Sequence, residues 1–156
     1  MHRNAEKVQE VLASLACNET VVELAETTRS ASEAASAIGT TVAQIAKSLV
    51  FLAGESAVLV IASGVNYVSL LKLSNYLGKT VVRADADTVK RVTGFPIGGT
   101  APVGHKTALR ILIDRDLINF PEIWAAAGTP HAVFRIAPAE LIRITGGELV
   151  DISGER

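Results

Sequence analysis

Residues 47–63 read KSLVFLAGESAVLVIAS, and two apolar runs within this stretch decide the fold. Lys47–Ala53 and Ala57–Ser63 are rich in Val, Leu, Ile and Ala, and the tripeptide GES between them has the composition of a turn. This pattern predicts a hairpin of two buried strands. Lys47 begins the first strand, so its charge must either reach the surface along the aliphatic stem or face a polar cavity.

Short helices and short strands are predicted on both sides of this hairpin. Apolar spacing and capping residues predict helices at Arg3–Ala16, Ala31–Ile38, Thr40 or Thr41 to Ala46, Val68–Leu77, Asp85–Val92 and Ala137–Ile144. Ser30 or Ser32 is expected to cap the second of these and Asp85 the fifth, and Gly39, Gly78 and Gly94 to end three of them. Further strands are predicted at Thr20–Leu24, Thr80–Arg83, Leu109–Ile113, Glu122–Ala126, Ala132–Ile136 and Leu149–Ile152. We therefore expect one α+β domain over residues 1–156, with a mixed, curved sheet of about seven short strands flanked by helices.

The composition excludes several classes of protein. Hydrophobic residues make up 49% of the 156 residues, which suits a globular core. Aromatic residues are only 4%, too few for an extensive stacking surface for single-stranded nucleic acid. The longest apolar run is interrupted at residues 54–56, short of the roughly 20 residues of a membrane helix. Cys17 is the only cysteine and is expected to be a small buried hydrophobe; without disulfide or signal peptide, we expect a cytoplasmic protein with no membrane partner.

Charge is unevenly distributed along a chain whose net charge is −1. Residues 1–46 carry three basic and six acidic side chains, whereas residues 72–115 carry eight basic and three acidic ones. The basic segment could form an anion-binding face, or it could simply be solvated.

Residues 94–105, GFPIGGTAPVGH, hold four glycines and two prolines. The segment matches neither a P-loop nor a dinucleotide-binding fingerprint. Its centre, Gly98–Pro102, suggests a rigid loop whose free amides can bind a phosphate, a carboxylate or an oxyanion. The alternative is a purely structural pair of tight turns that joins a helix to a strand.

The two histidines in Gly/Pro loops, His105 and His131, have no metal-ligand spacing, so we expect no metal site. Each could bind substrate through a hydrogen bond, act as a general base, or do neither. The pattern G-x-S-x-G is absent, so nothing indicates a serine nucleophile.

Several segments together resemble the YbaK/ProX (YbaK/EbsC-type) family. They are TRSASEAA, AKSLVF with Lys47 opening a strand, GGTAPVG with its G-x-x-x-P loop, AAGTP, and IAPAEL followed by TGG. The family comprises free-standing aminoacyl-tRNA deacylases related to the editing insertion domain of bacterial prolyl-tRNA synthetase. The resemblance covers the chain from about Thr27 to Ile152 and implies a curved, partly barrel-like mixed sheet.

The resemblance also implies an activity, hydrolysis of the ester of mischarged tRNA without metal or cofactor. Its substrate would be the 3′ acceptor end of tRNA(Pro) carrying a small amino acid, and prolyl-tRNA synthetase is a possible partner. The family's essential lysine matches Lys47, and its G-x-x-x-P loop supplies the other catalytic positions, Gly98, Gly99, Thr100, Ala101 and Pro102. Lys47 would hold a phosphate or the ester carbonyl, the loop amides the oxyanion, and the substrate 2′-hydroxyl would assist the water. We assign substrate binding to Arg29, Ser48, Asn66, His105, Gly128, Thr129 and His131.

One departure leaves the amino acid open. The branch of the family that acts on cysteine has Ser-Gly-Gly where this chain has Ala126-Ala127-Gly128. Two other functions also stay open at this point: a non-catalytic module that binds an aminoacyl or nucleotide ligand or docks on a synthetase, and a small-molecule hydrolase, which the missing motifs disfavour.

Overall fold

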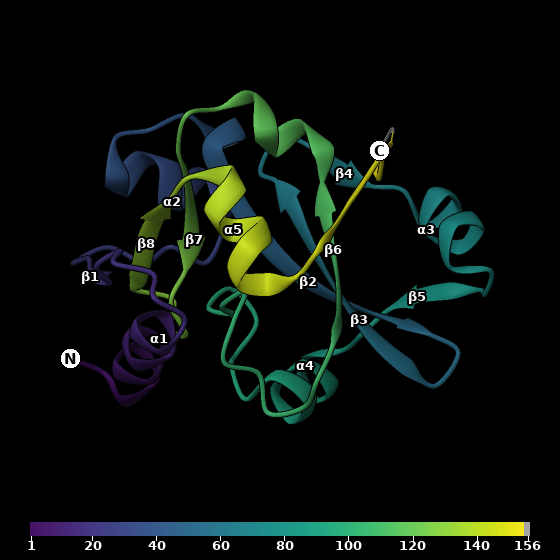
Figure 1. The fold of residues 1–156 in the computed structure, drawn as a ribbon, viewed down its shortest axis with the longest axis horizontal. Helices are drawn as coiled ribbons and strands as arrows, with labels where there is room; N and C mark the ends of the chain where they lie inside the picture. Colours follow the sequence, from purple (N-terminus) through teal and green to yellow (C-terminus); the bar gives the residue numbers. More distant parts are fainter. Residues whose placement is uncertain (155–156) are drawn as a thin grey trace.

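The predicted hairpin forms the centre of the fold in the computed structural model, which describes residues 1–154 (Figure 1). Strands β2 (Ile45–Ala53) and β3 (Ser56–Ser63) are antiparallel, with Lys47 opposite Ala62 and Ala53 opposite Ser56. The last six residues of β3 are all buried, and Leu59 to Ala62 have no exposed surface. The hairpin prediction is therefore confirmed.

The main sheet contains eight strands within residues 1–154, in the order β1-β8-β7-β2-β3-β6-β9, with β5 also paired to β2. The strands besides the hairpin are β1 (Val22–Glu23), β5 (Val81–Arg83), β6 (Arg110–Asp114), β7 (Ile123–Ala126), β8 (Ala132–Ile136) and β9 (Glu148–Val150). β2 with β7, β3 with β6 and β6 with β9 are parallel, whereas the other pairs are antiparallel. The sheet is mixed and is not a closed barrel, because β1 and β9 at its two ends do not pair. An α+β fold with a partly barrel-like sheet is thus confirmed.

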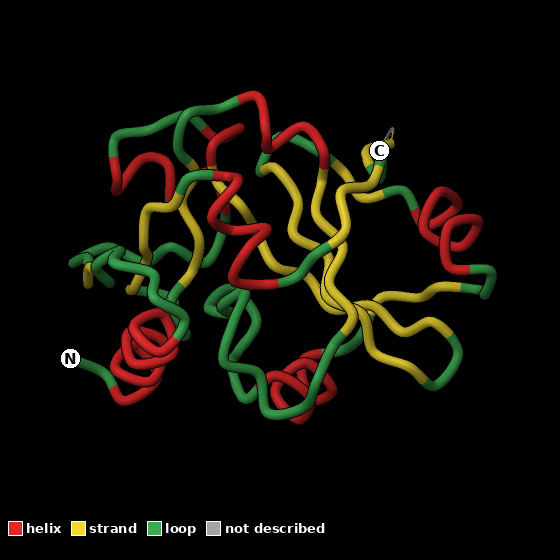
Figure 2. The backbone as a smooth tube through the Cα atoms, in the orientation of Figure 1, coloured by secondary structure: helices red, strands yellow, loops and turns green. Residues whose placement is uncertain are grey.

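Five α-helices surround the described strands (Figure 2). They are α1 (Arg3–Ser14), α2 (Ala31–Ile38), α3 (Leu70–Leu77), α4 (Ala86–Thr93) and α5 (Pro138–Thr145), with 3-10 turns η1 (Val42–Gln44) and η2 (Arg115–Asn119). The side chains of Ser30 and Asp85 cap α2 and α4 by accepting from the amides of Glu33 and Thr88. Gly39, Gly78 and Gly94 end α2, α3 and α4 with φ of 85°, 71° and 84°, a conformation that glycine adopts without strain.

The sequence interpretation was wrong at three boundaries. The helix expected to continue to Ala46 is only the 3-10 turn η1, because β2 already begins at Ile45. The helix expected from Val68 begins at Leu70, because Val68 pairs with Ser153 in the two-stranded sheet of β4 (Tyr67–Val68) and β10 (Ser153–Gly154). The strand predicted at Leu149–Ile152 is β9 (Glu148–Val150) and ends two residues early, and β10 follows it in a different sheet.

The two faces of β2 belong to different parts of the core. Ala46 and Val50 pack in the larger cluster with Phe95, Phe134 and residues of α1, α4 and α5. Phe51 and Ala53 pack in a second cluster with Leu73 of α3 and Ile152 near the C-terminus. Since side chains alternate along a strand, Lys47 lies on the face of the second cluster and Ser48 on the face of the first. No helix within residues 1–154 has the length and hydropathy needed to cross a bilayer.

Ser69, which caps α3, allows a test of the revised helix boundary. Its hydroxyl accepts a hydrogen bond of 3.1 Å from the amide of Lys72. Ser69→Ala should lower the free energy of unfolding by about 1 kcal/mol, measured by urea denaturation, because that amide loses its partner.

Ser36, exposed in the interior of α2, provides the matched control. Ser36→Ala should leave stability unchanged or raise it by up to about 0.5 kcal/mol, since alanine has the higher helix propensity. Equal urea midpoints for the two variants would show that Ser69 does not cap the helix.

Candidate functional site

A cavity of about 600 Å³ opens where the sheet splits along one edge of β2. On the side away from β3, Ile45 and Ala46 pair with β7, whereas residues 51–53 pair with β5. Between these two pairings, the side of residues 47–49 that faces away from β3 has no strand partner within the described chain. The backbone on that side therefore forms an open edge. The cavity is lined there by Lys47, Ser48 and Leu49, and around its rim by residues of α2, β7 and the loop after α4.

Lys47 is partly buried and makes its hydrogen bond with a neutral group. Its Nζ donates to the backbone carbonyl of Asn66 at 2.8 Å and lies 5.9 Å from the centre of the Tyr67 ring. Burial lowers the pKa of the Lys47 ammonium, the Arg83 guanidinium lowers it further, and the Asp114 carboxylate raises it. The side chain is thus a partly desolvated cation in a cavity, with donors left over for a ligand.

The glycine segment contributes a tight turn to the cavity wall. The amide of Gly99 and the hydroxyl of Thr100 both donate to the carbonyl of Pro96, at 3.0 and 2.9 Å. Gly98 occupies the third position of this turn with φ of 82°, which a residue with a side chain would adopt only with strain. Gly98 and Thr100 line the cavity.

The turn approaches other backbone segments very closely. A Cβ at Gly98 would lie 3.2 Å from the Cα of Arg29, and one at Gly99 would lie 2.7 Å from the carbonyl carbon of Thr129. These glycines therefore let three loops meet at the cavity wall. The backbone of the protein itself is therefore one of the groups that this glycine segment approaches closely.

The amides of Gly98–Ala101, expected to bind an oxyanion, differ in their availability. The Gly99 amide is already bonded to Pro96, whereas those of Gly98, Thr100 and Ala101 donate to no residue within 1–154. Of these three, only Gly98 and Thr100 belong to residues that line the cavity. Ala101 and Pro102 are buried and do not line the cavity.

The two loop histidines lie outside the cavity lining. His105 Nε2 lies 2.7 Å from the Ala101 carbonyl and must donate to it, because a carbonyl only accepts. Burial lowers the pKa of His105, the hydrogen bond to Ala101 opposes this, and Lys7 lowers the pKa further. The ring is therefore neutral, and its hydrogen bond stabilises the glycine loop. His131 is exposed, and its backbone joins the hairpin loop between β7 and β8 to Leu24.

Only some of the other predicted binding residues line the cavity. Arg29 and Ser48 line the cavity, whereas Gly128, Thr129 and Asn66 do not. Gly128 accepts from the side chain of Asn4 at 3.0 Å, which ties the β7–β8 loop to α1. The Ser48 hydroxyl is the only buried side-chain polar atom within residues 1–154 that has no hydrogen-bond partner, and it lies in the cavity wall. A group left unsatisfied there is expected to bind a water or a ligand atom.

The charge of the cavity is entirely positive. Its lining contains Arg29, Lys47 and Arg83 and no carboxylate. Neither guanidinium makes an ion pair with another side chain of residues 1–154. By contrast, three other cations of the basic segment bind acidic residues near the C-terminus: Lys72 and Arg115 bind Asp151, and Arg110 binds Glu148. Only part of the basic segment is therefore available to a ligand at this site.

Among the lining residues that sequence reasoning missed, three carry a charge or an aromatic ring: Arg83, Tyr67 and Trp124. Arg83 was one of eight basic residues in its segment, and nothing local distinguished it from the others. Tyr67 was hidden by the misplaced start of α3. The single tryptophan of the chain, Trp124, lay in a predicted strand and was a signal that could have been used.

No group of three or more His, Cys, Asp or Glu side chains within residues 1–154 is arranged to hold a metal ion. The lining also contains no His, Cys, Asp or Glu that could act as a general base. Chemistry in this cavity therefore depends on cations, hydroxyls, backbone amides and the ligand itself.

The family model of the aminoacyl-tRNA editing domain matches residues 25–144, a range that contains the whole cavity lining. A crystal structure described as that of a candidate trans-editing enzyme for prolyl-tRNA synthetase is similar, with a TM-score of 0.95 and 42% identity over 99% of each chain. Protein YwhH of Bacillus subtilis is 28% identical over 122 residues, which is 78% of each chain. Proline–tRNA ligase of Ligilactobacillus salivarius is 33% identical over 86 residues, 54% of this chain and 15% of the ligase.

Gly99→Ala tests the close approach of the loops. The new methyl group would overlap backbone atoms of residues 129–130, which cannot move as a side chain can. We expect a loss of roughly 1–3 kcal/mol in the free energy of unfolding. The amide resonances of Thr129 and His131 should shift in the NMR spectrum.

Gly39→Ala is the comparison, because the strain at Gly39 comes from its φ of 85° alone and nothing lies within 4 Å of the added atom. It should destabilise α2 while leaving the resonances of Thr129 and His131 in place. Unchanged stability in Gly99→Ala would mean that the three loops do not meet as described.

Proposed function

Because the chain belongs to the aminoacyl-tRNA editing domain family, whose reaction is the hydrolysis of aminoacyl-tRNA, we propose that its substrate is tRNA(Pro) mischarged with a small amino acid. The observation that carries this proposal is the cavity at the open edge of β2, with three cations and no carboxylate. An acceptor end brings phosphates and an ester, and both groups suit such a lining.

Two further parts of the cavity wall support the binding of an acceptor end, one for its phosphate and one for its base. The N-terminus of α2 contributes Ser30, Ala31 and Ser32 to the lining, and the first amides of a helix attract anions. Tyr67 and Trp124 offer ring faces on which an unpaired base can stack. We place the terminal phosphate among the cations and the ester beside Lys47 and the Pro96–Gly99 turn.

The reaction follows from the groups that line the cavity. An aminoacyl ester is already activated, so hydrolysis requires an oriented water and stabilisation of one oxyanion. The Lys47 ammonium and the free amides of Gly98 and Thr100 are the donors available to that oxyanion. A serine nucleophile would need an adjacent base, which the lining lacks, so we assign activation of the water to the 2′-hydroxyl of the substrate.

The size of the amino acid is limited by a recess of about 30 Å³ behind the turn. The recess shares Ser48, Gly98 and Thr100 with the main cavity and ends at Val50 and Val89. Such a volume admits roughly one water molecule or one methyl group. Larger side chains would meet the wall, which is how a hydrolytic sieve separates a small amino acid from proline.

The partner and the location follow from the same proposal. Similarity to part of a proline–tRNA ligase makes prolyl-tRNA synthetase the partner we propose for delivery of the tRNA. We propose a cytoplasmic location, where tRNA is charged.

Lys47→Ala tests the proposal directly. It should reduce single-turnover hydrolysis of mischarged tRNA(Pro) by at least about 100-fold, the effect of removing one oxyanion donor, while the fold stays intact. The substrates should be tRNA(Pro) charged with Ala, Cys, Ser, Thr and 2-aminobutyrate, each corrected for spontaneous hydrolysis. Lys79→Ala, a change of an exposed lysine outside the cavity, should retain full activity.

Two results would overturn the proposal. Full activity of Lys47→Ala would remove this lysine from the mechanism. Binding of an aminoacyl-adenosine analogue by the unaltered protein, with no turnover of any of the five substrates, would instead favour a non-catalytic binding module.

Arg83→Gln should separate phosphate binding from chemistry. Removing one phosphate contact should raise KM and reduce the slope of log kcat/KM against log salt by about 0.7, the value for a single-stranded end. Arg83 lowers the pKa of Lys47, so its removal should move the loss of activity at alkaline pH to higher pH. Arg91→Gln, on α4 and outside the lining, is the control; an equal slope change in both variants would refute a specific contact.

A further inference from the structure

A buried carboxylate lies behind the cavity, and the mechanism above does not use it. Asp114 ends β6 and is 1% exposed. β6 is parallel to β3, and β3 is antiparallel to β2, so the end of β6, the end of β3 and the start of β2 meet at one edge of the sheet. Asp114 therefore lies near Lys47 in the fold although 67 positions separate them in the sequence.

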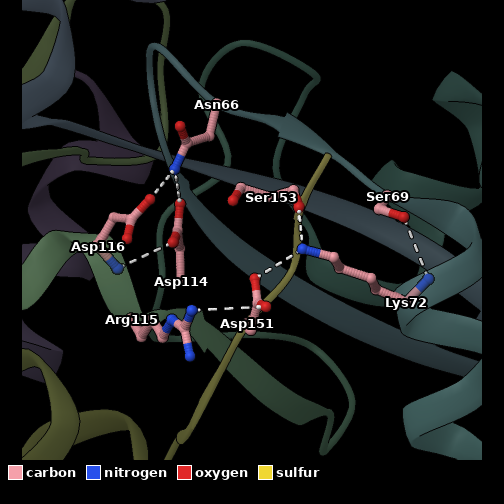
Figure 3. A network of polar contacts seen from close by, with 8 residues as sticks. All are labelled: Asn66, Ser69, Lys72, Asp114, Arg115, Asp116, Asp151 and Ser153. Carbon is pink, nitrogen blue, oxygen red and sulfur yellow. Dashed lines mark hydrogen bonds and ion pairs between the residues drawn. The ribbon is translucent and has the colours of Figure 1, made fainter. Parts of the chain in front are cut away.

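Three N–H groups donate to the Asp114 carboxylate. They are the amide of Ser63 at 3.0 Å, and the amide of Asp116 at 3.0 Å and the side-chain amide of Asn66 at 2.8 Å, the last two of which are drawn in Figure 3. A neutral asparagine at this position would turn its own NH₂ group toward one of these donors. The site is therefore built for a negatively charged acceptor.

Asn66 connects this carboxylate to the lysine. Its side-chain nitrogen lies between the carboxylates of Asp114 and Asp116, at 2.8 Å from each, which fixes the orientation of the amide (Figure 3). Its backbone carbonyl accepts the hydrogen bond from Lys47 Nζ at 2.8 Å. The turn between β3 and β4, which contains Asn66, is also held at Gly64. The Gly64 amide donates to the Ile45 carbonyl at 2.8 Å, and a Cβ added at Gly64 would lie 2.4 Å from the Val42 carbonyl oxygen.

We propose that Asp114 is a positioning residue for Lys47, acting through the side chain and the carbonyl of Asn66. The proposal rests on the function assigned above, since it concerns how the lysine is held for that reaction. A lysine side chain has four rotatable bonds, and a fixed carbonyl at the cavity wall selects one of its arrangements. Asp114 fixes that carbonyl.

The charges around Lys47 give Asp114 a second effect on it. Arg83 from β5 and Arg29 across the cavity are like charges, and Tyr67 from β4 presents its ring. Asp114 from the end of β6 and Asp116 from η2 are the carboxylates behind Asn66, and neither forms an ion pair with Lys47. Burial and Arg83 lower the pKa of Lys47, and Asp114 opposes both.

The test begins with Asp114→Asn, which keeps the shape and removes the charge. Its kcat should fall roughly 10- to 100-fold, the usual cost of a displaced catalytic group, with little change in KM. Because the carboxylate raises the pKa of Lys47, its removal should also move the alkaline loss of activity to lower pH. Asp151→Asn, which removes an exposed carboxylate that binds Lys72 and Arg115 instead, should leave kcat and the pH profile unchanged (Figure 3).

A double mutant separates positioning from a general loss of structure. If Asp114 acts through Lys47, Asp114→Asn should cost nothing further in the Lys47→Ala background. An additive loss, or an unshifted pH profile in the single variant, would show that Asp114 is only structural. Should Asp114→Asn fail to fold, Asp116→Ala, which removes one of the two acceptors of Asn66, is the second variant. It should lower kcat less than Asp114→Asn and cost nothing further in the Lys47→Ala background; an unchanged kcat or an additive loss would overturn the inference.

One readout needs no activity. In protein labelled with ¹³Cε-lysine, the Lys47 signal, assigned by its loss in Lys47→Ala, should titrate at lower pH in Asp114→Asn than in the unaltered chain. An unshifted titration would overturn the inference even if the enzyme is active. A shifted titration in a protein without deacylase activity would retain the inference about Lys47 and reject the proposed function.

Discussion

The open edge of β2 is the constraint on which the site depends. The strand pairs with β3 along nearly its whole length, but on its other side it loses β7 after Ala46 and meets β5 only at Phe51. The gap exposes the backbone of residues 47–49 and lets the cavity reach side chains from both faces of one strand. Lys47 and Ser48 can therefore line the same cavity although they point in opposite directions. A continuous sheet would have buried both.

Charge balance around this edge explains why a cation remains there. Burying an ammonium is costly, and the usual remedy is an ion pair. Here the partner of Lys47 is a carbonyl, and the carboxylates lie one residue further away, behind Asn66. A direct ion pair would occupy the ammonium. The indirect contact through Asn66 keeps the lysine charged and oriented. Its remaining N–H donors are then available to an anionic substrate in the cavity.

The sequence predicted best what depends on local patterns. The hairpin, the caps at Ser30 and Asp85 and the glycine ends of the helices follow from apolar period and turn chemistry over a few residues. Boundaries failed where a distant segment decided them: Val68 joins a strand because Ser153 pairs with it. The same distinction between local and distant signals applies to the residues of the site. Lys47 and the glycine turn carry local signals, whereas Arg83 and Asp114 reach the site only through strand pairing, which no local pattern specifies.

The central claim is that the aminoacyl end binds at the open edge of β2, between Lys47 and the Pro96–Gly99 turn. Titration of ¹⁵N-labelled protein with 3′-alanylamino-3′-deoxyadenosine, whose amide resists hydrolysis, tests it most directly. The account predicts that the amide resonances of Lys47, Ser48, Gly98 and Thr100 shift together and saturate. Shifts confined to the second large cavity, of about 510 Å³ and lined by Lys79, Thr107 and Leu109, with those four resonances unmoved, would contradict it.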